Sequence, residues 1–128
     1  MKTKKNVQLI IKGYRKCEAR IGFTFVPKKN SNYKLDYRKK YQNKISENNI
    51  FINENDYKQA LTYILFVNRV FNSLDEMLRK IIWECYFENA SHTDTRIELG
   101  ISSQTLTERK NDALRVFANA LRVAVYEE

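Results

Sequence analysis

Four polar side chains between positions 103 and 108 have the chemistry needed to read the edges of DNA bases. They are Ser103, Gln104, Thr107 and Glu108. A Gln side chain can bond adenine at two atoms at once, Ser and Thr hydroxyls can bond bases or phosphates, and a carboxylate can accept from cytosine. Two cations, Arg109 and Lys110, follow directly and have the charge to hold backbone phosphates. This stretch is the best candidate site in the chain if a helix presents it.

The apolar spacing predicts such a helix over about 103–125. Its inward positions, which fall on one helical face, are Leu106, Ala113, Leu114, Phe117, Leu121 and Val125. If Leu106 points inward, Gln104 and Thr107 lie about 160° and 100° from it around the helix axis. Both then project outward near the helix start, where groove-reading helices make their base contacts.

Two shorter helices, over 75–89 and 92–99, are predicted to come before this one. Ser73 with Glu76, and Ser91 with Asp94, have the spacing of N-terminal capping residues. These patterns set the predicted start of each helix.

The connection to the last helix has the features of a helix-turn-helix over about 92–112. Gly100 stands at the usual C-terminal position of a helix, and Ser102 or Ser103 can cap the next one. Leu99, Ile101 and Leu106 are expected to form the apolar wedge between the two helices. The structural alternative is a turn that only joins two packed helices.

The first 49 residues carry most of the positive charge. They hold 14 Lys and Arg against 3 Asp and Glu, a balance of +11, whereas residues 50–128 hold 9 against 12, a balance of −3. A basic segment ahead of an acidic body indicates an anionic partner, with nucleic acid first. The predicted basic arm consists of Lys28, Lys29, Lys34, Arg38, Lys39, Lys40 and Lys44.

We therefore divide the sequence into a basic arm, 1–49, and a helical domain, 50–128. The arm begins with an amphipathic helix over about 4–20, followed by an extended piece, Phe23–Val26, and a linker or weak surface helix. Tyr33, Tyr37 and Tyr41 are spaced by four, so on a helix their rings would line one face and could stack on single-stranded nucleic acid; packing against the body is the alternative.

A helix over 54–71 is predicted to be apolar on nearly every side, at "LTYILFV". Such a helix lies at the centre of a bundle or faces a second subunit, so a homodimer is compatible with this pattern.

Several classes of protein are not indicated. No apolar stretch reaches 18 residues, and the basic N-terminus lacks the apolar core of a signal peptide, so we expect a cytoplasmic protein with no membrane partner. Two distant cysteines and one histidine make no metal cluster, and no cofactor is expected. Without a nucleophile motif, a Gly-rich phosphate loop or a carboxylate pair, the chain is not expected to be an enzyme.

The segment "SLDEMLRKIIWECYFENASHTDTRIELGISSQTLTERKNDALRVFANAL" resembles region four of sigma factors, most of all the ArpU-type late transcription regulators of phages. The resemblance rests on Leu74, on Tyr86-Phe87-Glu88, on Leu99-Gly100-Ile101-Ser102 and on residues 113–118. Two departures are the missing Pro after Leu74 and the pair Thr95-Arg96, where the family has Ile and a small residue.

The resemblance implies an all-α fold, a small helical bundle with a sigma region 4-like helix-turn-helix at its C-terminal end. It also implies a DNA-binding transcription regulator that acts at promoters and contacts RNA polymerase. The alternative is a protein-interaction module, for example one associated with RNA polymerase, whose basic arm binds nucleic acid without sequence preference. The acidic body favours the alternative, and the Gly100 turn favours the regulator.

Overall fold

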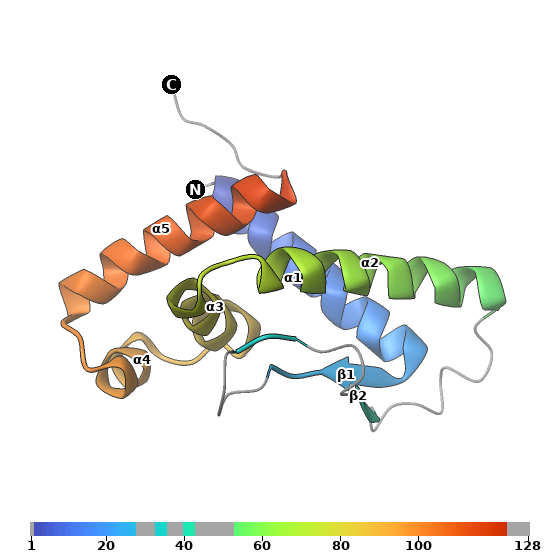
Figure 1. Ribbon diagram of the computed structural model, residues 1–128, viewed down its shortest axis with the longest axis horizontal. Helices are drawn as coiled ribbons and strands as arrows, with labels where there is room; N and C mark the ends of the chain where they lie inside the picture. The colour runs from blue at the N-terminus through green and yellow to red at the C-terminus, as the bar shows by residue number, and fades with distance from the viewer. Residues whose placement is uncertain (1, 28–32, 36–39, 43–52, 123–128) are drawn as a thin grey trace. The chain divides into compact units, whose positions relative to one another are not determined.

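A computed structural model describes residues 2–27, 33–35, 40–42 and 53–122 of the chain (Figure 1). The elements are α1 (Lys2–Ile21), β1 (Phe23–Phe25), β2 (Lys40–Gln42), α2 (Glu54–Asn72), α3 (Glu76–Ile82), the π-helical turn η2 (Trp83–Phe87), α4 (His92–Leu99) and α5 (Ser103–Leu121). The described residues are therefore mainly α-helical, as predicted. None of the described helices is long and apolar enough to span a bilayer.

The chain forms two compact units whose bounds differ from the predicted arm and body. Unit 1 contains residues 1–11 and 74–128, and unit 2 contains residues 12–73. The predicted first helix is confirmed as α1, and both units bury part of it: Val7 and Tyr14 have no exposed surface. Residues 1–11 and the later residues of the predicted arm therefore fall in different units.

In unit 2, the second half of α1 packs with α2 and a short strand pair. Tyr14 donates a hydrogen bond of 2.6 Å from its hydroxyl to Asn68 on α2. The extended piece predicted after α1 is confirmed as β1, which pairs antiparallel with β2, so that Phe25 stands opposite Lys40. The pairing brings the chain back along β1 from the segment that we predicted to be a linker or weak helix.

The predicted tyrosine face of a helix is wrong for the residues that can be assessed. Tyr33 has a positive φ of 57° and is buried, and Tyr41 belongs to β2; Tyr37 lies outside the described residues. Nearby, the backbone N–H of Leu35 donates to the Asn72 side chain, which donates back to the Leu35 carbonyl, both at 2.7 Å. This segment is therefore fastened to the end of α2 in a non-helical conformation.

Helix α2 follows the predicted range but not the predicted burial. Asn53 caps it, and Ala60, Ile64 and Val67 are buried at spacings of four and three. Leu65 and Phe66 are 38% and 39% exposed, so within this chain the helix buries one face instead of all sides, and the alternative that it faces a second subunit stays a prediction. Composition alone does not show which face of an apolar helix meets the core.

Unit 1 is a helical unit in which α5 packs on α3 and α4. The expectation that Ser73 caps α3 is wrong: Asp75 takes the N-cap position, and Ser73 ends α2 with its hydroxyl donating to the Val70 carbonyl at 2.6 Å. Ser73 lies closer to the free carbonyls of the preceding helix, which it satisfies instead.

The predicted helix over 75–89 is present, but its second half is wound as a π-helix. The Glu88 N–H donates to the Trp83 carbonyl five residues back, at 2.9 Å. The Trp83 and Phe87 rings stack with centroids 4.7 Å apart, and the indole N–H donates to Glu88 Oε1 at 2.7 Å. These contacts stabilise the π-helical turn, which is wider than a turn of α-helix.

The caps predicted for the last two helices are confirmed. Ser91 accepts from the Asp94 N–H at the start of α4, and Ser102 accepts from the Thr105 N–H at the start of α5. Gly100 ends α4 in the left-handed conformation, with φ 67° and ψ 36°. Helix α5 ends at Leu121; the predicted extension to Val125 lies outside the described residues. As predicted, the described residues between 75 and 122 contain no strand.

Candidate nucleic-acid interface

The turn at Gly100 sets α4 and α5 at a steep angle to each other. In Figure 1, α4 is seen nearly end-on while α5 runs along its length. Three residues, Gly100 to Ser102, make the connection, and the two helices are in direct contact. A short helix, a Gly-containing turn of three residues and a longer crossing helix are the parts of a helix-turn-helix.

Leu106 fixes the rotation of α5 about its axis. Its side chain has no exposed surface, as predicted for an inward residue, while Leu99 and Ile101, the other two residues of the predicted wedge, are half-buried. The predicted base-reading residues, which the structure places on the outside of α5, are Ser103, Gln104, Thr107 and Glu108. Arg109 is also exposed.

His92 contacts the start of α5, a role that the sequence did not indicate. Its Nε2 atom lies 2.9 Å from Ser103 Oγ and 3.2 Å from the Ser103 carbonyl oxygen. The first residue of α4 is therefore tied to the first residue of α5. The hydroxyls of Ser103 and Thr107 therefore already have partners within the protein.

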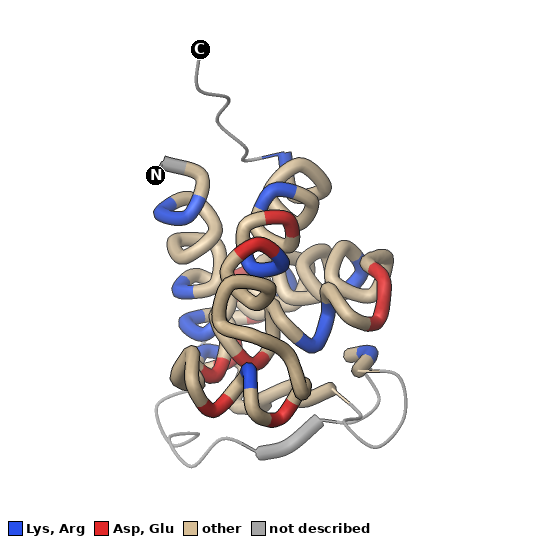
Figure 2. The backbone as a smooth tube through the Cα atoms, turned by 90° about the vertical axis from the view of Figure 1, so that its left-hand side faces the viewer, with Lys and Arg blue, Asp and Glu red and all other residues tan. Residues whose placement is uncertain are grey.

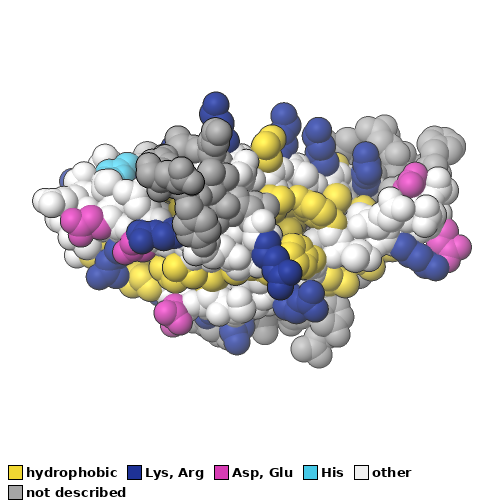
Figure 3. Space-filling model, turned by 90° about the horizontal axis from the view of Figure 1, so that it is seen from above, with side chains coloured by type: hydrophobic (Ala, Val, Ile, Leu, Met, Phe, Trp, Pro, Cys, Tyr) yellow, Lys and Arg dark blue, Asp and Glu magenta, His cyan; other side chains and the backbone are white. Residues whose placement is uncertain are grey.

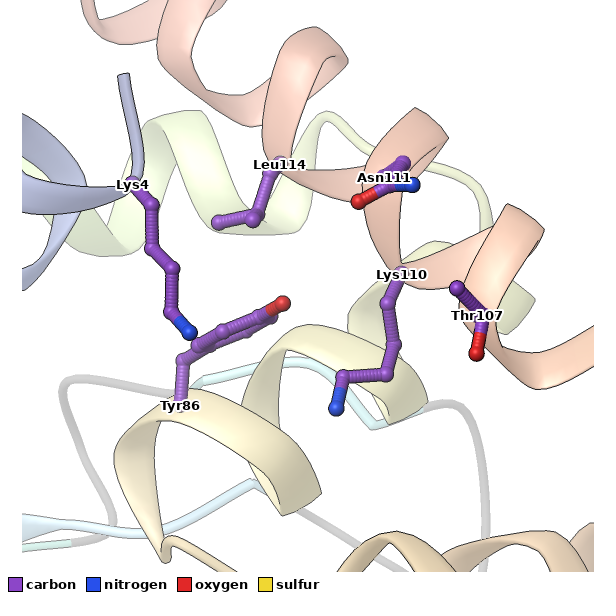
Figure 4. Close-up of a pocket in the computed structure, with 6 residues that line it drawn as sticks. All are labelled: Lys4, Tyr86, Thr107, Lys110, Asn111 and Leu114. Carbon is purple, nitrogen blue, oxygen red and sulfur yellow. The ribbon is translucent and has the colours of Figure 1, made fainter. Parts of the chain in front are cut away.

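Lys110, which we predicted to hold a backbone phosphate, is half-buried. Its Nζ lies 6.0 Å from the centre of the Tyr86 ring, within the range of a cation–π contact. Lys110 and Thr107 line a hollow together with Lys4, Tyr86, Asn111 and Leu114 (Figure 4). No sequence signal could have placed Lys4 there, because Lys4 precedes the other lining residues by more than 80 positions.

Thr95 and Arg96, where the chain departs from the resembled family, both lie in α4. Thr95 is the buried residue, at 1% exposure, and its Oγ1 accepts from the Cys85 thiol at 3.8 Å. Arg96, which stands where the resembled family has a small residue, is half-buried. Burial raises the pKa of the Cys85 thiol, which favours the unreactive protonated form.

The helix-turn-helix itself carries little positive charge. Between positions 92 and 112 the sequence has three Lys and Arg against four Asp and Glu. The net positive charge of the described chain lies chiefly on α1, where blue bands recur along the helix that starts at the N-terminus (Figure 2). Lys4 and Lys5 are exposed in the part of α1 that belongs to unit 1.

Most of the predicted basic arm lies outside the described residues. This applies to Lys28, Lys29, Arg38, Lys39 and Lys44. Lys34 is exposed, and Lys40 belongs to β2. The role of the basic arm in binding nucleic acid stays a prediction.

No family model matches the chain, and neither the curated proteins nor the solved structures give a match. The assignment of the candidate interface therefore rests on its geometry alone. Among the described residues, no group of three or more His, Cys, Asp or Glu is arranged to hold a metal ion.

Proposed function

We propose that this chain is a DNA-binding transcription regulator of the sigma region 4-like type, with the first turns of α5 entering the major groove. One observation carries the proposal. Leu106 is fully buried behind the left-handed Gly100 turn, so that Gln104 stands exposed at the start of a helix with its side chain directed away from the core. Groove-reading helices present their base contacts at this position.

The residues of α5 then divide by role. Gln104 contacts a base, with Thr107 beside it, while Arg109 holds a backbone phosphate. Glu108 is exposed among them and repels phosphate unless it accepts from a cytosine amino group. The charge of α1 and of the predicted arm supplies the attraction to DNA that α4 and α5 lack.

The test is selection of bound sequences from random duplex DNA, followed by affinity measurements on the preferred site. Gln104→Ala should weaken that site by roughly 1–3 kcal/mol and relax preference at about one base pair, because one bidentate contact is lost. Gln59→Ala, on an exposed position of α2, is the matched control and should leave the affinity for the preferred site and the base preference unchanged.

Unchanged binding by Gln104→Ala, with circular dichroism like that of the wild type, would contradict the proposal. The turn would then only join two packed helices, and the second candidate function would replace the first.

The second candidate is a protein-interaction module, for example one that binds RNA polymerase. It is favoured by apolar side chains that reach the surface of unit 1: Ile97 on α4 is 64% exposed and Val116 on α5 is 42% exposed. Apolar side chains also reach the surface in the view of Figure 3, among Lys and Arg side chains. Exposed apolar side chains of this kind favour contact with a protein over contact with a phosphate backbone.

A further inference from the structure

A small hollow in unit 1 is lined by the first turns of α1, by η2 and by α5. Its volume is about 210 Å³. Sites for drug-sized ligands measure roughly 300–1,000 Å³, so this hollow suits a single small group. All six lining residues are described, and all belong to unit 1.

The lining is positively charged and rich in hydrogen-bond donors. Lys4 and Lys110 supply two ammonium groups, and the residues that line the hollow include no carboxylate. Figure 4 shows the two lysines on either side of Tyr86, with Asn111 and Thr107 extending from α5 nearby. The Thr107 hydroxyl donates to the Ser103 carbonyl at 3.0 Å, which leaves the Asn111 amide as the neutral donor on α5.

Tyr86 forms the floor between the two cations. Its side chain is buried, at 8% exposure, and burial, with a smaller effect from Cys85, raises its pKa to about 12. The phenol therefore stays protonated at neutral pH and keeps a proton to donate. The contact of Lys110 with the ring also holds that ammonium group in place before any ligand arrives.

We propose that this hollow is a binding site for a phosphate group, held between the ammonium groups of Lys4 and Lys110. Charge-assisted hydrogen bonds from lysines to phosphate oxygens are strong, and lysine is a common phosphate ligand in proteins. The phosphate could belong to the backbone of DNA lying along α5 or to a free phosphorylated small molecule. Only the first source rests on the proposed function.

The experiment follows amide signals of the full chain by NMR while sodium phosphate is added, with sodium chloride at equal ionic strength as the reference. Signals of Tyr86, Lys110 and Asn111 should shift and saturate with phosphate but not with chloride. Lys4→Gln and Lys110→Gln should each raise the phosphate Kd about tenfold, because each removes a charged donor. Lys5→Gln, an exposed lysine on the next residue of α1 that does not line the hollow, should change it less than twofold.

A second arm separates the two sources. If the phosphate comes from DNA, Lys4→Gln should reduce the slope of log affinity against log salt on random duplex by about 0.9, the value for one phosphate contact. If Lys4→Gln weakens phosphate binding but leaves this slope unchanged, the site is assigned to a small molecule. This result is independent of the Gln104 test, so the site and the proposed function can fail separately.

Three results would overturn the proposal. The first is the absence of saturable shifts with phosphate. The second is saturation that Lys4→Gln and Lys110→Gln affect no more than Lys5→Gln. The third is a smaller slope of log DNA affinity against log salt for Lys4→Gln without saturable phosphate binding in the wild type, because Lys4 would then act only as a distant charge.

Discussion

Glu18 is the buried charged residue whose surroundings are best defined. Its side chain is 1% exposed, and its two oxygens accept from Arg15 Nη1 and from the Phe25 backbone N–H, both at 2.7 Å. The carboxylate thus joins α1 to β1 in unit 2. Burial nevertheless raises its pKa, with the hydrogen bonds and the charge of Arg15 acting in the opposite direction.

The raised pKa of Glu18 predicts how stability changes with pH. A carboxyl group whose pKa is higher in the folded state stabilises the fold most below its unfolded pKa, near 4.5, and loses this contribution as the pH rises through the folded pKa. The free energy of unfolding of the wild type, relative to Glu18→Gln, should therefore fall between pH 4 and pH 7. Urea denaturation at several pH values measures this difference.

The control for this prediction is Glu54→Gln, which removes one negative charge from an exposed position on α2. A difference between wild type and Glu18→Gln that stays constant from pH 4 to pH 7 would show that the hydrogen bonds to Arg15 and Phe25 at least offset the effect of burial on the pKa of Glu18.

At the scale of elements, the Gly100 turn sets the direction of α5. A Cβ atom added at Gly100 would meet nothing within 4 Å, so substitution there introduces backbone strain without a steric clash. Gly100→Ala should lower the free energy of unfolding by about 1–2 kcal/mol, because the left-handed conformation is costly for a residue with a Cβ. Gly100→Asn should cost less, because Asn tolerates this conformation.

Urea denaturation of the three proteins checks this order. Equal stability of the Ala variant and the wild type would mean that the turn does not hold a positive φ in solution.

The elements that the sequence predicted correctly are those with local signals. The caps Ser91 and Ser102 and the stop at Gly100 act within three or four residues, so the sequence contains all their determinants. The cap predicted at Ser73 is wrong because this residue lies between the end of α2 and the start of α3, and its side chain can cap either helix. Two capping candidates so close together are decided by packing.

The features that the sequence could not predict are non-local. The pairing of Phe25 with Lys40 and the approach of Lys4 to Tyr86 join positions far apart in the chain. The candidate base-reading residues could be predicted because one inward residue, Leu106, fixes their direction on a helix. The environment of Lys110 could not, because it depends on a neighbour from another element.

At the scale of the whole molecule, residues 1–49 cannot be removed to test the basic arm. Val7 and Tyr14 are fully buried, so the deletion would remove core side chains from both units. Replacement of the arm cations by Gln keeps α1 intact. The seven positions are Lys28, Lys29, Lys34, Arg38, Lys39, Lys40 and Lys44.

This neutralised chain should bind random duplex DNA with a flatter salt dependence. Each lost phosphate contact reduces the slope of log affinity against log salt by roughly 0.9, so full engagement of the arm predicts a reduction of about 6. Fluorescence anisotropy over a range of salt concentrations measures the slope, with thermal unfolding as a check on the fold. An unchanged slope would refute the assignment of non-specific binding to these residues.

The division of α1 between two units also has a consequence for synthesis on the ribosome. Unit 2 is contiguous, whereas unit 1 joins residues 1–11 to the segment that starts at Leu74. At roughly 5–20 residues per second, translation from there to the end of α5 takes roughly 2–10 s. During that interval the nascent chain displays Val7 and Ile11 without their final neighbours, and this apolar face is available to chaperones until the last helix emerges.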